Sequence, residues 1–274
     1  MELSVANLDQ LMPVSRVNLN EKYSVRLAES SELSEIYKLR YDIFCTELGG
    51  TTSNLTNIDY DEFDDYCDHL IVKCGSKIVG TYRLLPLYRI ASKNLKSYCS
   101  KEFDLSNILL KYGTNVLELG RSCIDPKFRS GVVAKLLWKG ISDYISEQNI
   151  DALIGCASVH GMTHFEALKL YKSFLKYDYV HNSLLAPVNR KYKSEIKLRN
   201  QVSLNVCVSK IELMLQLPPL VKGYFNIGAK ILSEPAYDEQ FNCHDFLILL
   251  ERQQIPQKYI HSFSKQNNSI AQSM

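Results

Sequence analysis

The stretch Glu118-Leu119-Gly120-Arg121-Ser122-Cys123 places a carboxylate and a guanidinium three residues apart, in a segment whose apolar neighbours Val116 and Leu117 predict a buried strand. Charged residues on a core strand usually have a partner or a function. The segment leads into the basic turn 125–131 and then into an amphipathic helix predicted over 131–148. A strand, a basic turn and a helix N-terminus in this order favour binding of an anionic or thioester-linked donor.

Helices and strands alternate on both sides of this segment. We predict helices over 31–48, 131–148 and 164–175, with Ser30 or Ser31 as the N-cap of the first, and strands over 23–27, 69–74, 78–87, 115–124 and 151–157. The turn-sized spacer 75–77 makes a hairpin of the strands that flank it. The helix 131–148 is a crossover, so the strands before and after it are parallel. This order predicts an α/β fold, a three-layer sandwich around a mixed central sheet.

The second half of the chain continues the pattern. We expect an irregular segment over 1–20, a core over 21–200, a C-terminal α+β extension over 201–262 and a frayed tail over 263–274. The extension holds predicted strands at 202–208 and 246–250, and a helix opened by Pro218-Pro219-Leu220. No linker rich in Gly, Ser or Pro precedes it, so we expect it to pack on the core and to complete the pocket.

Composition limits the class of protein. With 274 residues, 46% of them apolar, the chain can bury a full core. Its 8 cysteines form no C-x-x-C pair, which favours reduced thiols in a cytoplasmic protein without structural zinc. No signal-like N-terminus and no apolar run of membrane-spanning length is present, so we expect any membrane contact to be peripheral, on the inner face. A net charge of +2 argues against nucleic-acid binding.

One local charge cluster is strong enough to suggest a partner. Arg190, Lys191, Lys193, Lys197 and Arg199 lie within ten residues and are opposed only by a single glutamate. A solvated surface, a docking site for an acidic carrier protein and attraction to an anionic membrane all fit this pattern.

Several motifs occur together in the order found in one enzyme family. The N-terminal ones are Tyr60-Asp61-Glu62-Phe63-Asp64-Asp65, His69-Leu70-Ile71-Val72, Gly80-Thr81-Tyr82-Arg83-Leu84-Leu85-Pro86, Glu102-Phe103-Asp104-Leu105 and Glu118-Leu119-Gly120-Arg121-Ser122-Cys123. The C-terminal ones are Leu217-Pro218-Pro219-Leu220-Val221-Lys222-Gly223-Tyr224, Gly228-Ala229, Glu234-Pro235-Ala236 and Asp245-Phe246-Leu247. From about residue 23 to about 262 the chain resembles the L-ornithine N-alpha-acyltransferases of ornithine-lipid synthesis, a branch of the Gcn5-related acyltransferase superfamily.

A more distant resemblance is to the acyl-homoserine-lactone synthases. It rests on their signature positions, which here are Arg40, Phe44, Asp61, Asp64, Arg83, Phe103, Glu118 and Arg121. Those enzymes also transfer an acyl chain from acyl carrier protein to an amine. The long C-terminal half follows the ornithine acyltransferases instead.

The resemblance implies an activity and its partners. It implies a Gcn5-related N-acyltransferase-like sandwich that moves a long-chain, 3-hydroxylated acyl group from acyl carrier protein to the α-amine of ornithine, with an O-acyltransferase acting afterwards. No cofactor is implied beyond the acyl-phosphopantetheine of the carrier. The turn Arg129-Ser130-Gly131-Val132-Val133-Ala134 lacks the second glycine of the loop that cradles coenzyme A, which favours the carrier protein as donor. We assign carrier docking to Arg129, Arg190, Lys191 and Lys193.

Glu118 and Arg121 are the predicted catalytic residues. Acyl transfer to an amine needs a base, and a buried Glu118 can take the proton directly or through water, while Arg121 would oppose the rise of its pKa. The alternative is an ion pair of Glu118 with Arg121 or Arg83 that only positions strands.

The predicted substrate-binding residues are Arg40, Phe44, Asp61, Asp64, Arg83 and Phe103. By resemblance, the two aspartates pair with Arg40 and Arg83 and offer carboxylates to an ammonium; a solvated acidic loop is the alternative. A calcium loop does not fit, because no turn glycine is present and Leu70 replaces the closing glutamate. Phe44 and Phe103, with Trp138, line an acyl channel or belong to the ordinary core.

Other candidates are weaker. His160 and His164 could bind metal, but no third ligand is apparent, and Cys123 is not needed as a nucleophile for direct transfer. Two rival functions stay open: an N-acyl amino acid synthase that uses another acceptor such as glycine, and a non-catalytic module that binds acyl carrier protein or lipid.

Overall fold

The computed structural model describes residues 23–51, 56–93, 95–193 and 207–255. The predicted irregular N-terminal segment and tail, and most of the predicted strand 202–208, lie outside these residues, as do Lys197 and Arg199.

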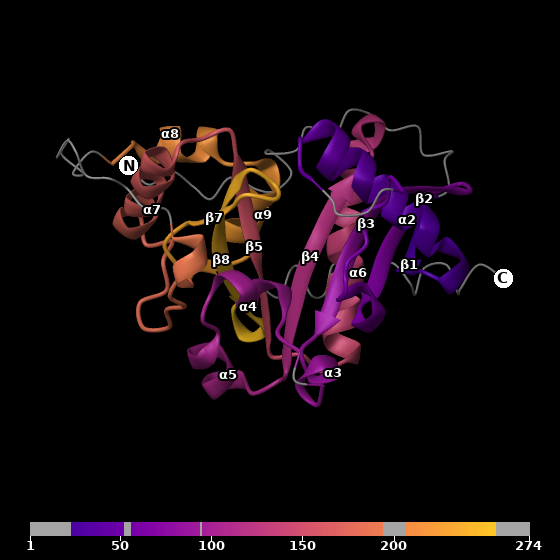
Figure 1. Ribbon diagram of the computed structural model, residues 1–274, viewed down its shortest axis with the longest axis horizontal. Helices are drawn as coiled ribbons and strands as arrows, with labels where there is room; N and C mark the ends of the chain where they lie inside the picture. Colours follow the sequence, from indigo (N-terminus) through magenta and orange to yellow (C-terminus); the bar gives the residue numbers. More distant parts are fainter. Residues whose placement is uncertain (1–22, 52–55, 94, 194–206, 256–274) are drawn as a thin grey trace, which may run out of the picture.

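A twisted sheet crosses the whole described part of the chain (Figure 1). Its order is β1-β2-β3-β4-β5-β8-β6, with β7 also paired to β8. The strands are β1 (Tyr23–Leu27), β2 (Asp68–Cys74), β3 (Lys77–Pro86), β4 (Val116–Ile124), β5 (Ala152–His160), β6 (Lys230–Ile231), β7 (Ala236–Asp238) and β8 (Cys243–Glu251). The expected hairpin is β2–β3, and the expected parallel pair is β4–β5. The remaining pairs in this sheet are antiparallel, so the sheet is mixed as predicted.

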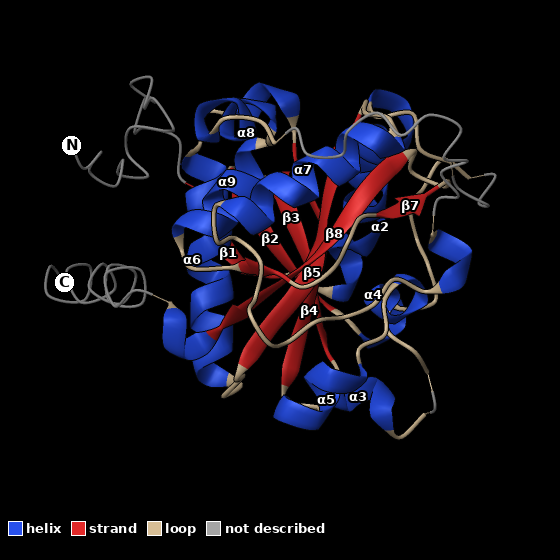
Figure 2. Cartoon of the chain, turned by 90° about the vertical axis from the view of Figure 1, so that its left-hand side faces the viewer, coloured by secondary structure: helices blue, strands red, loops and turns tan. Residues whose placement is uncertain are grey.

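Helices cover both faces of the sheet, which gives the predicted three layers (Figure 2). One face carries α6 (Val132–Glu147), α7 (His164–Lys176), α8 (Lys210–Gln216) and α9 (Pro219–Asn226). The other carries α2 (Leu33–Tyr41), α3 (Tyr88–Ala91), α4 (Tyr98–Glu102) and α5 (Ser106–Tyr112). No helix in these described ranges is both long enough and apolar enough to span a bilayer.

Local sequence explains most helix ends. Thr163 caps α7 and Ser209 caps α8, each in a capping box with a glutamate three residues later. The expected serine cap of the first helix is wrong. Ser30 and Ser31 lie inside a short 3-10 turn, where the Glu32 carboxylate accepts the backbone N–H of Glu29. That helix also ends early, because α2 passes into a π-helical turn, η2 (Asp42–Glu47).

Two glycines let α6 pack closely on the sheet. A Cβ on Gly80 would lie 2.5 Å from Val133, and one on Gly140 would lie 2.6 Å from Leu70. The C-terminal segment then inserts β8 alongside the full length of β5, from the pair Ala152–Glu251 to the pair His160–Cys243. It therefore contributes to the same sheet as the rest of the chain.

Candidate active site

The central opening of the sheet lies between its two parallel strands. β4 and β5 pair from Val116 with Ala152 to Leu119 with Gly155, and beyond that point they diverge (Figure 1). A Cβ on Gly155 would lie 2.7 Å from the Leu119 carbonyl oxygen, so glycine is needed where the strands separate. Beyond this point the two strands no longer pair with each other, and their remaining residues line a cavity of about 1180 Å³. A cavity of this size can hold an extended acyl donor together with a small acceptor.

A bulge in β4 turns the two predicted catalytic residues toward this cavity. Thr81 pairs with Cys123 while Arg83 pairs with Gly120, so β4 has one extra residue over that interval. The extra residue lies near Arg121, whose φ of +50° is uncommon for a side chain other than glycine. In a regular strand, residues three apart face opposite sides. The bulge reverses that alternation, and Glu118 and Arg121 both line the cavity.

The wall of the cavity is mostly apolar and comes from both ends of the chain. Phe44 of η2, Trp138 of α6 and Tyr224 of α9 line it, and the Trp138 and Tyr224 rings pack edge to face at 5.5 Å. Phe103 does not belong to this wall. Its ring is fully buried in the core beside α4 and α5, and its backbone bridges to Val188, so of the two alternatives given for Phe103, acyl channel or ordinary core, the structure shows the core.

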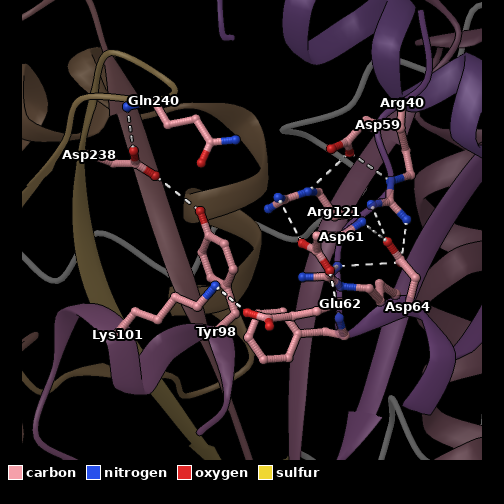
Figure 3. A network of polar contacts seen from close by, with 12 residues as sticks. Arg40, Asp59, Asp61, Glu62, Asp64, Tyr98, Lys101, Arg121, Asp238 and Gln240 are labelled. Carbon is pink, nitrogen blue, oxygen red and sulfur yellow. Dashed lines mark hydrogen bonds and ion pairs between the residues drawn. The ribbon is translucent and has the colours of Figure 1, made fainter. Parts of the chain in front are cut away.

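Three arginines and three aspartates form a buried cluster beside the cavity (Figure 3). Arg40 is fully buried and donates to Asp59 at 2.8 Å and to Asp64 at 2.7 and 3.2 Å. Arg83 donates to Asp61 at 2.7 Å and to Asp64 at 3.4 Å. Arg121 donates to Asp59 at 3.1 Å and to Asp61 at 3.2 Å. The expected pairing of the acids with Arg40 and Arg83 is therefore present.

Burial and ion pairing of Asp61 and Asp64 exclude the alternative in which they belong to a solvated acidic loop. Burial by itself would raise the pKa of Asp64, but the guanidiniums of Arg40 and Arg83 outweigh it and hold the pKa below its usual range. Burial opposes the shift at Asp61 too, and Arg83 and Arg121 again outweigh it and lower the pKa. Each carboxylate is already matched by a guanidinium, so an ammonium would have to share it with an arginine, and the role of Asp61 and Asp64 in binding the acceptor stays a prediction.

The aspartates hold two arginines in place. Arg83 and Arg121 line the cavity, whereas the surrounding carboxylates and Arg40 are not among its lining residues within the described ranges. The Arg121 guanidinium also lies 4.8 Å from the Tyr98 ring and 4.7 Å from the Phe241 ring. Such multiple contacts restrict the guanidinium to one orientation.

Glu118 has a different environment from the one expected. Its two carboxylate oxygens accept the backbone N–H groups of Tyr98 at 3.1 Å and Cys99 at 2.9 Å, and the residue is 4% exposed. Neither of the ion pairs considered for it, with Arg121 or Arg83, occurs between these described residues. Glu118 thus lines the cavity and holds the first turn of α4 in place. Each of its carboxylate oxygens keeps a further lone pair for a second donor.

The buried His69 beside Asp64 gives a pH prediction. Burial outweighs the attraction of Asp64, 3.7 Å away, and lowers the pKa of His69 to about 4, so the ring is neutral at pH 7. In the unfolded chain the ring binds a proton below its ordinary pKa of about 6.5. Between those two values only the unfolded state gains a proton, and stability must fall as the pH falls.

We therefore expect the native protein to lose more unfolding free energy than His69→Leu as the pH falls. The extra loss is on the order of 1 kcal/mol per pH unit between pH 6 and 4.5. Chemical denaturation of both proteins across that range measures it. A difference that does not change with pH would show that His69 titrates alike in both states.

The carrier-docking candidates lie in two separate places. Arg129 lines the cavity, where it pairs with Glu47 at 2.6 and 2.8 Å and donates to the Ile124 carbonyl. Arg190, Lys191 and Lys193 are exposed in and after the turn η5 (Arg190–Tyr192), which packs beside β7. The sequence pattern alone could not distinguish these two environments.

A second group of acids was missed from the sequence. Glu102 of α4, Asp238 of β7 and Asp245 of β8 are buried, and both Asp238 and Asp245 line the cavity. The signal was present, because Asp245 directly precedes the apolar run 246–250. The criterion that identified Glu118, a charge on a core strand, identifies Asp245 as well.

Comparisons with known proteins agree on a class. Residues 39–139 match the acetyltransferase (GNAT) domain family. The chain is 33% identical over 262 residues to an L-ornithine N(alpha)-acyltransferase of Brucella abortus, covering 89% of each protein. It is 33% identical to that of Agrobacterium fabrum, covering 89% of this chain and 86% of the relative. A solved CoA-dependent acyl-homoserine lactone synthase with SAM and isopentyl-CoA shares the fold, with a TM-score of 0.51, 13% identity and 89% coverage of both chains.

Proposed function

Because this chain belongs to the L-ornithine N(alpha)-acyltransferase family, and is thus an acyltransferase, we propose that it acylates the α-amino group of L-ornithine. The donor is a long-chain, 3-hydroxylated acyl group on acyl carrier protein, and the product is lyso-ornithine lipid. The observation that carries this proposal is the cavity at the divergence of β4 and β5, where Glu118 and Arg121 meet an apolar wall.

The chemistry requires a bond exchange that this cavity can accommodate. The amine nitrogen attacks the thioester carbonyl, the C–N bond forms and the C–S bond breaks. Glu118 accepts the proton of the acceptor ammonium, directly or through water, while Arg121 and Arg83 orient the acceptor carboxylate. The nitrogen gives up its second proton as the amide forms, and the leaving sulfur takes up that proton. Burial raises the pKa of Tyr82 to about 12, so its hydroxyl, hydrogen-bonded to that of Tyr224, stays protonated and can hydrogen-bond the leaving sulfur.

The choice of acyl carrier protein as donor is supported by the turn 129–134 and by the exposed basic residues near η5. Gly131 opens α6 with a left-handed φ of +91°, but the second glycine of a coenzyme A loop is missing from the turn. The exposed Arg190, Lys191 and Lys193 supply a basic surface that an acidic carrier protein would recognise. Because the product is a lipid, we expect the protein to act at the inner membrane face, where an O-acyltransferase would consume that product.

Carrier recognition gives a second prediction. The double charge reversal Lys191→Glu with Lys193→Glu should raise the KM for acyl carrier protein by about tenfold at low salt, because exposed charges act on association. The effect should shrink as salt is added. The matched control reverses the exposed Lys38 and Lys176, which lie on other elements. A KM equal to that of the control pair would remove the docking role.

Lipid analysis tests the function as a whole. The protein is expressed in a host that makes 3-hydroxyacyl carrier protein, and lipid extracts are examined by mass spectrometry. An N-acylated ornithine that appears only with the protein supports the proposal. A different N-acyl amino acid would keep the reaction but change the acceptor. No new lipid from folded protein would favour the non-catalytic binding module.

A further inference from the structure

The acids across the cavity from the arginine cluster have no matching cations. Glu102, Asp238 and Asp245 are between 2% and 5% exposed. In the described part of the chain, no lysine, arginine or histidine forms an ion pair with any of the three. The arginine cluster, by contrast, balances three guanidiniums with three carboxylates. Buried carboxyl groups are normally paired with a cation or kept protonated, so this set can take up an external cation at the cost of a proton.

The hydrogen bonds show which of the three acids is available. Asp238 is occupied, because it accepts the Tyr98 hydroxyl at 3.0 Å and the backbone N–H of Gln240 at 2.8 Å (Figure 3). Asp245 accepts a weak bond from the Cys243 thiol at 3.4 Å, and its carboxylate also accepts hydrogen bonds from the side chains of Ser158 and the protonated Glu102. The Glu102 Oε2 atom is buried and has no hydrogen-bond partner among the described residues. Asp245 and Glu102 are therefore the acids with acceptor capacity left.

The two acids point at one place, and the cavity reaches it. An oxygen of Glu102, an oxygen of Asp245 and the Cys156 sulfur all lie within 4.8 Å of one another. Asp245 and Cys156 line the cavity, as does Tyr98, whose ring contacts the Arg121 guanidinium at 4.8 Å and whose hydroxyl donates to Asp238 (Figure 3). Arg121 and Asp245 therefore line one cavity, which offers an amino acid a guanidinium and a carboxylate.

We propose that Asp245, with Glu102 behind it, binds the side-chain ammonium of a diamino-acid acceptor and so determines the preference for ornithine. This assignment rests on the proposed function. An ammonium has three donors, and the free oxygens of these two carboxylates are suited to accept them. Burial and the neighbouring acids raise the pKa of Glu102 to about 10, and burial raises that of Asp245 as well, which a bound cation would reverse.

A metal ion is the rival occupant of this place. Carboxylates can ligate zinc, and thiols can do so once they have lost their protons to become thiolates. The hydrogen bond with Cys99 and burial raise the pKa of Cys156, and burial raises that of Cys243, so both thiols keep their protons. Zinc would have to displace the protons of both thiols, whereas an ammonium needs only the carboxylates, and removal of metal with EDTA distinguishes the two occupants.

The test compares L-ornithine with L-norvaline, which has the same carbon skeleton without the side-chain amine. The measured quantity is the ratio of kcat/KM for the two acceptors. Asp245→Asn and Glu102→Gln should each lower that ratio by about 100-fold or more, because either change removes one partner of a buried charge pair. Asp65→Asn, an exposed acid beyond the cavity, is the matched control and should keep the ratio.

A further variant guards against loss of folding. Asp245→Glu keeps the charge and lengthens the side chain by one methylene, so it should move the preference from ornithine toward the shorter L-2,4-diaminobutyrate. Variants that fold and keep the native preference would overturn the inference while leaving ornithine acylation intact. A preference that EDTA abolishes and Zn²⁺ restores would overturn it in favour of a metal. If the native protein acylates no ornithine, the proposed function itself fails.

Discussion

Replacement of Glu118 by glutamine is expected to lower kcat for ornithine acylation by about 10²- to 10⁴-fold, the usual contribution of a general base. Glutamine has nearly the same shape but cannot take the ammonium proton. The measurement is steady-state turnover with acyl carrier protein as donor and a range of ornithine concentrations. Binding of acyl carrier protein, measured separately, should be unchanged.

The pH dependence distinguishes a base from an anchor. Glu118 also holds the backbone N–H groups of Tyr98 and Cys99, so the variant could lose activity through a displaced α4. If Glu118 is the base, the deficit of Glu118→Gln should shrink at alkaline pH, where free amine is already abundant. A deficit of the same size at every pH would assign the residue to positioning alone, and an unchanged kcat would remove it from the site.

Asp64→Asn is expected to have the largest effect on stability. Asp64 accepts bonds from Arg40, Arg83 and the backbone of Asp61, and its side chain is fully buried. The amide would leave two buried guanidiniums undercompensated, so we expect a loss of about 3–5 kcal/mol in unfolding free energy. Chemical denaturation of the two proteins at pH 7 measures it.

The neighbouring residue provides the control for this experiment. Asp65 is exposed and bonds the Tyr60 hydroxyl at 2.8 Å, so Asp65→Asn should change the unfolding free energy by about 0.5 kcal/mol or less. Similar values for the two variants would contradict the account, because they would mean that burial in the arginine cluster adds nothing to the importance of Asp64.

Local sequence signals predicted the parts of the fold that depend on near neighbours. The spacer 75–77 gave the β2–β3 hairpin, and the amphipathic helix 131–148 gave the parallel pair β4–β5. The bulge at Arg121 and the π-helical turn η2 depend on register and packing against distant strands. Those contacts leave no periodic trace in the sequence, and the insertion of β8 beside β5 is equally non-local.

In the candidate site too, only the residues with a local sequence signal could be predicted. Glu118 and Arg121 could be identified because a charge in an apolar strand is visible in the sequence. The pairing of Asp61 and Asp64 with Arg40 and Arg83 could be expected only from the family resemblance, since those partners come from α2 and β3, and the pairing of Asp61 with Arg121 of β4 was not predicted. Nor could the sequence distinguish Phe44, which lines the cavity, from Phe103, which is core, because tertiary packing and not the neighbouring residues decides which of the two places an aromatic ring reaches.

Acceptor competition tests the central claim most directly. Purified protein is incubated with 3-hydroxyacyl carrier protein and an equimolar mixture of amino acids that includes ornithine, lysine, glycine and norvaline, and the products are identified by mass spectrometry. The account predicts N-acyl ornithine as the dominant product, lost in Glu118→Gln. A dominant product from glycine or norvaline, or no product with native protein, would contradict it.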